Sequence, residues 1–241
     1  MSVIVNIVIG LATSVISGGL VWLWERGKRG RALARKARFF GTEPGRPCLI
    51  VMNSKHDSPR SAAHQDVQAM IEIATLAGEL GCEVSVTSSD EFQGSNGDRT
   101  EFCVGGPLGG SNLRTGGHLA AYVPGVAIHP YGTGPDSVAF TVGGRTYRYR
   151  RGDQEYALVV KFRPTEATAS VILICGQSAT ANRAAIAFLK RAHRELRESV
   201  ASVDRFCLVI KVAGIATYGH LGTSLERDES EAAFTPAARA D

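Results

Sequence analysis

The amino-acid sequence predicts an α/β domain behind one N-terminal transmembrane helix. Short apolar runs of strand length alternate with two long segments of helical periodicity, which is typical of a partly parallel sheet covered by helices. Residues 137–151 change to an alternating pattern that turns at Gly143 and Gly144, and this predicts an antiparallel hairpin inserted into the fold. Residues 1–24 are mainly apolar, with Asn6 as the one strongly polar side chain, and they predict the membrane helix.

The transmembrane anchor is predicted at residues 1–24. No charged side chain occurs in the 22 residues from Val3 to Trp24. As a helix this run is about 33 Å long, enough to cross the hydrocarbon of a bilayer. Basic residues follow the run and stay on the cytoplasmic side, so we expect the N-terminus outside and the main domain in the cytoplasm. A cleaved signal peptide would carry its charge before the apolar run, so we favour a single-pass protein of the cell membrane.

Residues 25–47 are predicted to form a basic juxtamembrane stalk, helical as far as Phe40, and a linker. Eight basic and two acidic residues stand between Glu25 and Arg46. Because the whole chain carries a formal charge of only +4, the rest is close to neutral, which argues against a nucleic-acid partner. The stalk is instead expected to contact anionic headgroups of the lipid bilayer.

Small residues recur every four positions within the predicted anchor, at Gly10, Ser14 and Gly18. They therefore lie along one helix face, where a second helix can approach closely, and they suggest a homo-oligomer. Glycine and serine are also common in membrane helices that do not associate, so both interpretations stay open.

The main cytoplasmic α/β domain is predicted at residues 48–221. Residues 48–52 (CLIVM), 62–80 and 82–87 form a strand, a helix and a second strand, which together make a βαβ unit. The later strands are expected at residues 101–104, 125–128, 156–162, 170–175 and 206–212, and the later helices at residues 118–122 and 179–200. The tail, residues 222–241, is polar, acidic and rich in alanine, and we expect it to be disordered.

Ligand-binding groups are expected beyond the carboxyl ends of the strands, where open α/β sheets bind their ligands. The segments that qualify are residues 53–60, 105–115, 176–183 and 214–220. The richest is GGPLGGSNLRT at residues 105–115. Its glycines allow close backbone approach, the helix that follows favours an anion, and Arg114 is a candidate phosphate clamp. The alternative is a glycine-rich turn that only connects two elements.

Ser178 lies in GQSAT, residues 176–180, between a predicted strand and a predicted helix. The motif is similar to the nucleophile elbow of α/β-hydrolases, and Asp204 and His220 follow in the matching chain order. Thr180, however, stands where the elbow carries glycine. A serine that caps the following helix explains the motif better.

Other reactive side chains are scattered. His56, Asp57 and His64 lack a third ligand at a useful spacing, so solvated histidines and helix capping explain them better than a metal ion. We therefore predict no metal site and no cofactor. Asp90 and Glu91 follow the second strand, where they are either candidates for binding a ribose hydroxyl or part of an ordinary acidic loop.

Two stretches suggest a family. The run FCVGGPLGGSN (residues 102–112) resembles the strand and GGP–Asn segment of Rossmann-like domains in the nucleoside deoxyribosyltransferase and SLOG group. The later runs EYALVVKF, SVILICGQSATANRAAIAFL and FCLVIKV are similar to the closing part of bacterial domains of that kind. The resemblance implies a Rossmann-like sheet and a nucleotide-like ligand. It also implies a place in membrane-associated bacterial defence or signalling. The deoxyribosyltransferases use a carboxylate nucleophile, to which no single residue of this chain corresponds.

These observations lead to a first hypothesis, a membrane-anchored sensor or effector that binds a nucleotide-like ligand. The predicted binding residues are Gly105, Gly106, Asn112, Arg114, Thr115, Gly176, Ser178 and Asn182. The second hypothesis is an enzyme that cleaves an N-glycosidic or ester bond in the same crevice, with Glu91, Glu155 or Ser178 as the reactive group. The third is a non-catalytic scaffold at the membrane.

Overall fold

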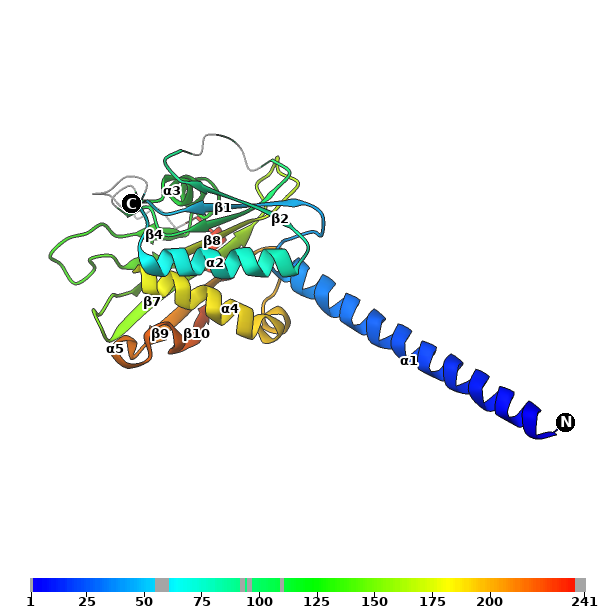
Figure 1. The fold of residues 1–241 in the computed structure, drawn as a ribbon. Coiled ribbons are helices and arrows are strands. Elements are labelled where there is room, and N and C mark those ends of the chain that lie inside the picture. The colour runs from blue at the N-terminus through cyan, green and yellow to red at the C-terminus, as the bar shows by residue number, and fades with distance from the viewer. Residues whose placement is uncertain (1, 55–60, 92–93, 95–96, 109–110, 237–241) are drawn as a thin grey trace.

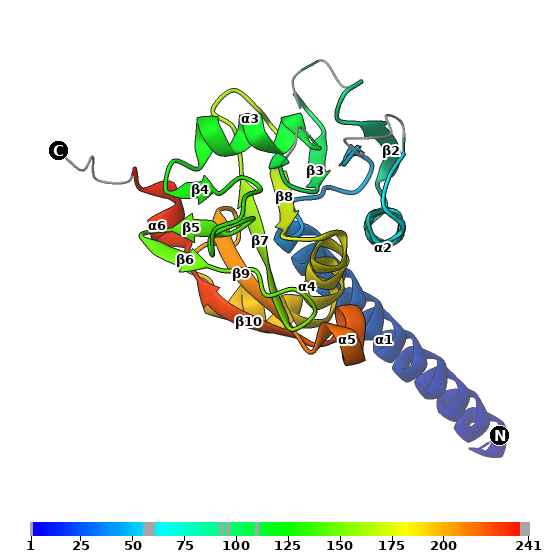
Figure 2. The ribbon, with the colours of Figure 1, turned by 90° about the vertical axis from the view of Figure 1, so that its left-hand side faces the viewer.

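The computed structural model describes residues 2–54, 61–91, 94, 97–108 and 111–236. It confirms an α/β domain, from which one long helix projects (Figure 1). A seven-stranded sheet lies between two layers (Figure 2). Helices α2 (His64–Glu79) and α4 (Ala179–Ser199) cover one face. Helix α3 (Leu113–Tyr122), a small sheet and helix α6 (Ser230–Phe234) cover the other.

The main sheet is mixed, with the order β10-β9-β7-β8-β3-β1-β2. Strands β2, β1, β3 and β8 are neighbours and run parallel, whereas β7 runs antiparallel to both β8 and β9. The strands are β1 (Pro47–Met52), β2 (Glu83–Ser88), β3 (Thr100–Val104), β7 (Gln154–Phe162), β8 (Val171–Gly176), β9 (Phe206–Ala213) and β10 (Thr223–Asp228). Strands β1, β3, β7 and β8 are almost wholly buried, as continuous apolar runs predict for strands covered on both faces.

The predicted hairpin consists of β5 (Phe140–Val142) and β6 (Arg145–Tyr147). Its turn residues Gly143 and Gly144 have φ values of 55° and 80°, the left-handed conformation that a tight hairpin turn requires. The hairpin does not join the main sheet. It pairs with β4 (Val126–Ile128) in a separate three-stranded sheet, because Phe140 and Val142 pack against the face of the main sheet rather than its edge.

The prediction of a disordered tail at residues 222–241 is wrong for the part that the structure describes. Strand β10 pairs antiparallel with β9, and Ala233 of α6 is fully buried. The side chains of β10 are mostly exposed. An edge strand of this kind is held by backbone hydrogen bonds and needs few apolar residues, so its polar composition gave no signal. The turn before it contains α5 (Ile215–Tyr218) and η2 (Gly219–Leu221).

Helix α1 (Ser2–Phe39) is continuous over 38 residues, from the apolar run through the basic stalk. Its last turn is buried in the domain at Ala37 and Phe39, whereas the described large apolar side chains of its first 24 residues are exposed. The chain then turns at Gly41, and β1 begins at Pro47. Within the described part of the chain, no helix combines the length and the apolar character needed to cross a membrane.

Lys161 attaches α1 to the sheet. Its side chain is fully buried on β7, an inner strand between β9 and β8. Its Nζ donates hydrogen bonds to the carbonyl oxygens of Arg38 at 2.7 Å, Phe39 at 3.1 Å and Val203 at 2.6 Å. The ammonium group therefore caps the carboxyl end of α1, where free carbonyls and the helix dipole favour a cation. Burial lowers the pKa of Lys161 from 10.5 to about 8.

We predict that Lys161→Met frees the end of α1. The substitution removes the Nζ donor from three buried or part-buried carbonyls, of which that of Arg38 still accepts from Gly41 N at 3.1 Å. The loss should lower the free energy of unfolding by about 2 kcal/mol. Urea unfolding measures the loss, and hydrogen exchange of the amides at residues 36–42 locates it. Lys211→Met, a half-buried lysine on the adjacent strand β9, is the matched control. Equal effects of the two substitutions would contradict the capping role.

Candidate functional site

A cavity of about 150 Å³ lies beyond the carboxyl ends of β1, β3 and β8. Strand β2 lies on one side of β1 within the sheet and β3 lies on the other side of β1, so the strand order reverses between β1 and β3. Three of the four predicted segments meet here. Their residues in the cavity wall include Asn53, Gly106, Gly176, Ser178 and Asn182, and Asp66 joins them from α2. The fourth segment, residues 214–220, contributes no residue to the wall.

Asp66 and Asn182 form a buried polar pair across the cavity wall. Asn182 Nδ2 donates to Asp66 Oδ1 at 2.8 Å, and Asn182 Oδ1 accepts from the backbone N–H of Gly176 at 2.6 Å. Asn53 Nδ2 lies 3.4 Å from Asp66 Oδ2. Burial raises the pKa of Asp66, and the two amide hydrogen bonds oppose part of this rise. The network fixes β1, α2 and α4 relative to one another.

Asn53 also has an unused acceptor. Its Oδ1 is buried and has no hydrogen-bond partner among the described residues. Buried polar atoms almost always have a partner, so this oxygen is available to a donor on a ligand. The residue is tightly placed, because Gly105 (φ 99°) lies so close that a Cβ there would be 2.5 Å from Asn53 Cγ. Gly105 is therefore needed to seat Asn53.

Ser178 caps α4, as the sequence predicted. Its backbone is extended, with φ −146° and ψ 167°, and its Oγ accepts from Ala181 N at 3.2 Å. The same hydroxyl donates to Glu155 Oε2 on β7. Burial raises the pKa of Glu155, and the hydrogen bond from Ser178 opposes this. The cavity wall thus contains a serine whose hydroxyl is hydrogen-bonded to the buried carboxyl group of Glu155.

The outer wall of the cavity comes from the loop between β4 and β5. Tyr131 contributes its side chain, which is 72% exposed, and Val138 and Phe140 form an apolar patch. Val138 has φ 53°, a conformation that a β-branched residue adopts only at a cost of order 1–3 kcal/mol. Strain of this kind is concentrated at ligand sites, and here it lies in the wall of the cavity.

Arg114, the predicted phosphate clamp, is engaged elsewhere. Its Nε and Nη2 donate to the two carboxylate oxygens of Glu101 at 2.8 and 2.9 Å, and its Nη1 donates to the carbonyl of Gly94 at 2.8 Å. Glu101 was not expected in this role, because it appears in the sequence as part of an apolar strand. The guanidinium fork is therefore turned away from the cavity, whose described wall contains no lysine or arginine.

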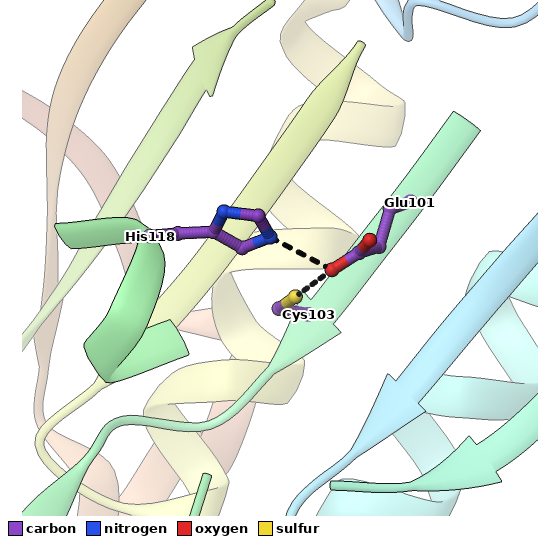
Figure 3. Close-up of side chains that lie close together, drawn as sticks. All are labelled: Glu101, Cys103 and His118. Atoms are coloured by element: carbon purple, nitrogen blue, oxygen red, sulfur yellow. Dashed lines mark hydrogen bonds and ion pairs between the residues drawn. The ribbon is translucent and has the colours of Figure 1, made fainter. Parts of the chain in front are cut away.

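Glu101, Cys103 and His118 lie close together under α3 (Figure 3). His118 Nε2 is 2.9 Å and Cys103 Sγ is 3.1 Å from Glu101 Oε1. These are ligand types that zinc accepts. However, Arg114 already pairs with both carboxylate oxygens, so a cation would share the carboxylate with a fixed positive charge. The geometry therefore fits a buried ion-pair network that attaches α3 to β3 better than it fits a metal site.

The remaining predicted binding residues shape the loop. Asn112 caps α3 by accepting from Thr115 N at 3.0 Å, and its Nδ2 donates to Val104 O at 2.9 Å. Thr115 is fully buried. A Cβ at Gly106 would lie 2.8 Å from Cys175 Sγ, so that glycine is needed for packing. The loop at residues 105–115 includes residues 109 and 110, which lie outside the described residues, as do His56 and Asp57.

The hydrolase triad is not assembled. Asp204 pairs with Arg38 at 2.8 Å, beside the end of α1 and at the opposite end of the strands from Ser178. His220 neighbours Arg183 instead, and burial lowers its pKa. The hypothesis of a nucleophile elbow is therefore wrong, because two of its three members do not reach the serine.

Glu91 lines a second hollow, which shares Asn53 with the cavity. Asp90 accepts from the hydroxyls of Ser54, at 2.9 Å, and Ser88.

Two residues of the cavity wall, Asp66 and Tyr131, were not predicted from the sequence. Asp66 could have been found from its place in the first turn of the helix that follows β1, whereas nothing in the sequence predicts that the loop of Tyr131 reaches the cavity.

We predict that the Glu101 network stabilises the domain only above acidic pH. Burial alone would raise the pKa of Glu101, but hydrogen bonds from Arg114, His118 and Cys103 lower it from 4.5 to about 2. The unfolded chain therefore binds more protons between these values. About 3 kcal/mol of stability should be present above pH 4.5 and lost as the pH falls towards 2.

Urea unfolding of the wild type and of Glu101→Gln across this range tests the prediction, since the difference between the two should shrink on acidification. Leu119→Ala, which weakens the packing of the same helix without removing a charge, should destabilise by an amount that does not change with pH. A constant difference for Glu101→Gln would refute the linkage.

Comparison with known proteins supplies no relative. No family model, no curated protein and no solved structure matches the chain. The function therefore has to be inferred from the residues and geometry of the cavity.

Proposed function

We propose that the protein is a membrane-bound sensor or effector whose α/β domain binds a nucleotide-like ligand in the cavity at the ends of β1, β3 and β8. The observation that carries the proposal is Asn53, a residue that lines a polar cavity at the switch point of the sheet and whose buried Oδ1 has no partner among the described residues. Sheets of this kind bind their ligands at that point. The bacterial signalling or defence role that the sequence resemblance implies is part of the proposal.

The composition of the wall favours the uncharged part of such a ligand. Amide, hydroxyl and carboxyl groups both donate and accept hydrogen bonds, which suits the hydroxyls of a ribose or the edge of a base. Because the described wall contains no lysine or arginine, any phosphate would point away from it. The exposed ring of Tyr131 is placed to stack on a base.

The membrane part of the proposal rests on α1. Its described large apolar side chains between Val3 and Trp24 are all exposed, and no part of the domain covers them. Water-exposed apolar surface of this extent marks an interaction site, and a bilayer is the partner that an uncharged run followed by basic residues fits. Gly18 lies in open space, as a close helix–helix contact would require, so self-association of α1 remains part of this proposal.

We predict that a thermal-shift screen of the full chain against nucleosides, nucleotides, cyclic nucleotides and NAD yields a ligand that stabilises it by several degrees. A ligand at about 100 times its dissociation constant adds about 2.7 kcal/mol to the native state. Tyr131→Ala should weaken that binding by about 1 to 3 kcal/mol because the stacking surface is lost, whereas Tyr131→Phe should preserve it.

Tyr218→Ala is the matched control, since Tyr218 is also exposed but does not line the cavity. It should leave the affinity unchanged. If no compound of the panel stabilises the chain, the scaffold hypothesis replaces the sensor. If a ligand binds equally well to Tyr131→Ala, the cavity binds it without stacking.

A second candidate function is an enzyme that cleaves an N-glycosidic or ester bond in the same cavity. The observation that favours it is the contact between the Ser178 hydroxyl and the buried carboxyl group of Glu155. A carboxyl group with a raised pKa beside a hydroxyl is an arrangement used for proton transfer. Glu155 itself does not line the cavity, so it would act through Ser178.

The two functions make different predictions for Glu155→Gln, which keeps the shape of the side chain and removes its charge. For an enzyme, turnover of the ligand found in the screen should fall by a factor of 100 or more with little change in affinity. For a sensor, product analysis should detect no turnover in either protein. Asp66→Asn is the comparison variant, and as part of the binding network it should weaken affinity in both cases.

A further inference from the structure

A basic groove of about 760 Å³ lies between the stalk part of α1 and the carboxyl-terminal half of α4. Seven lysine or arginine residues and a single glutamate line it. Five of the basic residues come from α1, between Lys28 and Lys36. The other two, Arg194 and Arg197, come from α4 in the folded domain.

Three of the seven basic residues have an ion-pair partner. Arg29 lies 3.8 Å from Glu25, Lys36 pairs with Glu79 at 2.9 Å, and Arg197 lies 3.2 Å from Glu198. For Arg35 and Arg194, the described residues provide no hydrogen-bond or ion-pair partner. Uncompensated positive charges on both walls of one groove attract anions, and low dielectric walls strengthen the field between them.

The groove continues from the exposed apolar part of α1. Lys28 Nζ lies 3.3 Å from the ring centroid of Trp24, and Arg26 Cζ lies 5.1 Å from that of Trp22. Tryptophan rings beside basic side chains are typical of the headgroup region of a bilayer. Since one helix carries the apolar run and one wall of the groove, the surface next to the groove fits lipid better than nucleic acid.

We propose that this groove binds the phosphate headgroups of anionic phospholipids and that Arg194 and Arg197 hold the domain against the membrane surface. The proposal rests on the membrane binding of α1 and adds a contact made by the domain itself. It also orients the ligand cavity. Ser178, which lines the cavity, caps the start of α4, and Arg194 lies 16 residues further along, so the two are about 24 Å apart and the cavity lies on the side away from the bilayer.

In the experiment, the full chain is diluted from a nonionic detergent into a mixture of two kinds of vesicle in equal amounts. One kind contains phosphatidylcholine alone, and the other also contains phosphatidylglycerol. Flotation gives the ratio of protein on the two. The wild type should prefer the anionic vesicles, less so at high salt because exposed charges are screened. Arg194→Glu/Arg197→Glu should reduce the preference by about 25-fold or more, since each basic residue near the surface contributes roughly a factor of five.

Arg150→Glu/Arg151→Glu is the matched control. It makes the same change of charge at two exposed arginines just before β7, at the end of the sheet away from α1, and should leave the preference intact. Equal losses for both double variants would overturn the proposal, because charge alone would then explain the preference. So would loss of the preference in inorganic phosphate but not in sodium chloride of equal ionic strength, because the groove would then bind free phosphate rather than lipid. Tighter binding of a short DNA duplex than of the anionic vesicles would also overturn it. Failure to bind phosphatidylcholine vesicles would instead refute membrane insertion by α1.

Discussion

The contact on which the architecture depends is the one between Lys161 and three backbone carbonyls. Burying an ammonium group is costly, and the cost is offset only where several oxygens converge on it. Here those oxygens belong to the end of α1 and to the loop that leads into β9. A single side chain on the inner strand β7 therefore joins the N-terminal helix, the sheet and the segment after α4. Its position explains why α1 ends at Phe39 and packs into the domain.

The cavity is organised by a similar use of buried polar groups. Asn182 accepts a hydrogen bond from the backbone N–H of Gly176 and donates one to Asp66, so that one side chain positions the end of β8 and helix α2. Arg114, which was predicted to bind a phosphate, is instead paired with the carboxylate of Glu101, and this ion pair fixes α3. The described polar groups of the cavity wall are thus amides, hydroxyls and carboxyl groups. These groups distinguish ligands by the direction of hydrogen bonds rather than by charge.

Much of the fold could be predicted from the sequence, because continuous apolar runs such as CLIVM and SVILIC have few other uses in a chain of this size. The helix caps at Asn112 and Ser178 also follow from local chemistry. Three features were out of reach. The pairing of β10 with β9 depends on backbone hydrogen bonds. The ion pair between Glu101 and Arg114 depends on how β3 and α3 are placed relative to each other. The position of Tyr131 depends on where the small sheet packs on the main sheet. Each is a tertiary relation, without a local pattern.

Helix α1 is unbroken from its apolar end to the buried turn at Ala37 and Phe39. A rod of 38 residues is about 57 Å long, and the structure places no hinge between its two ends. A tilt or rotation of the helix near Trp22 would therefore also tilt or rotate the end that packs on the sheet. A flexible linker would not transmit such a motion. Any rearrangement of neighbouring rods would in the same way turn the attached sheets relative to one another. Helix α1 is therefore a rigid connection between its apolar end and the domain, unlike a flexible linker.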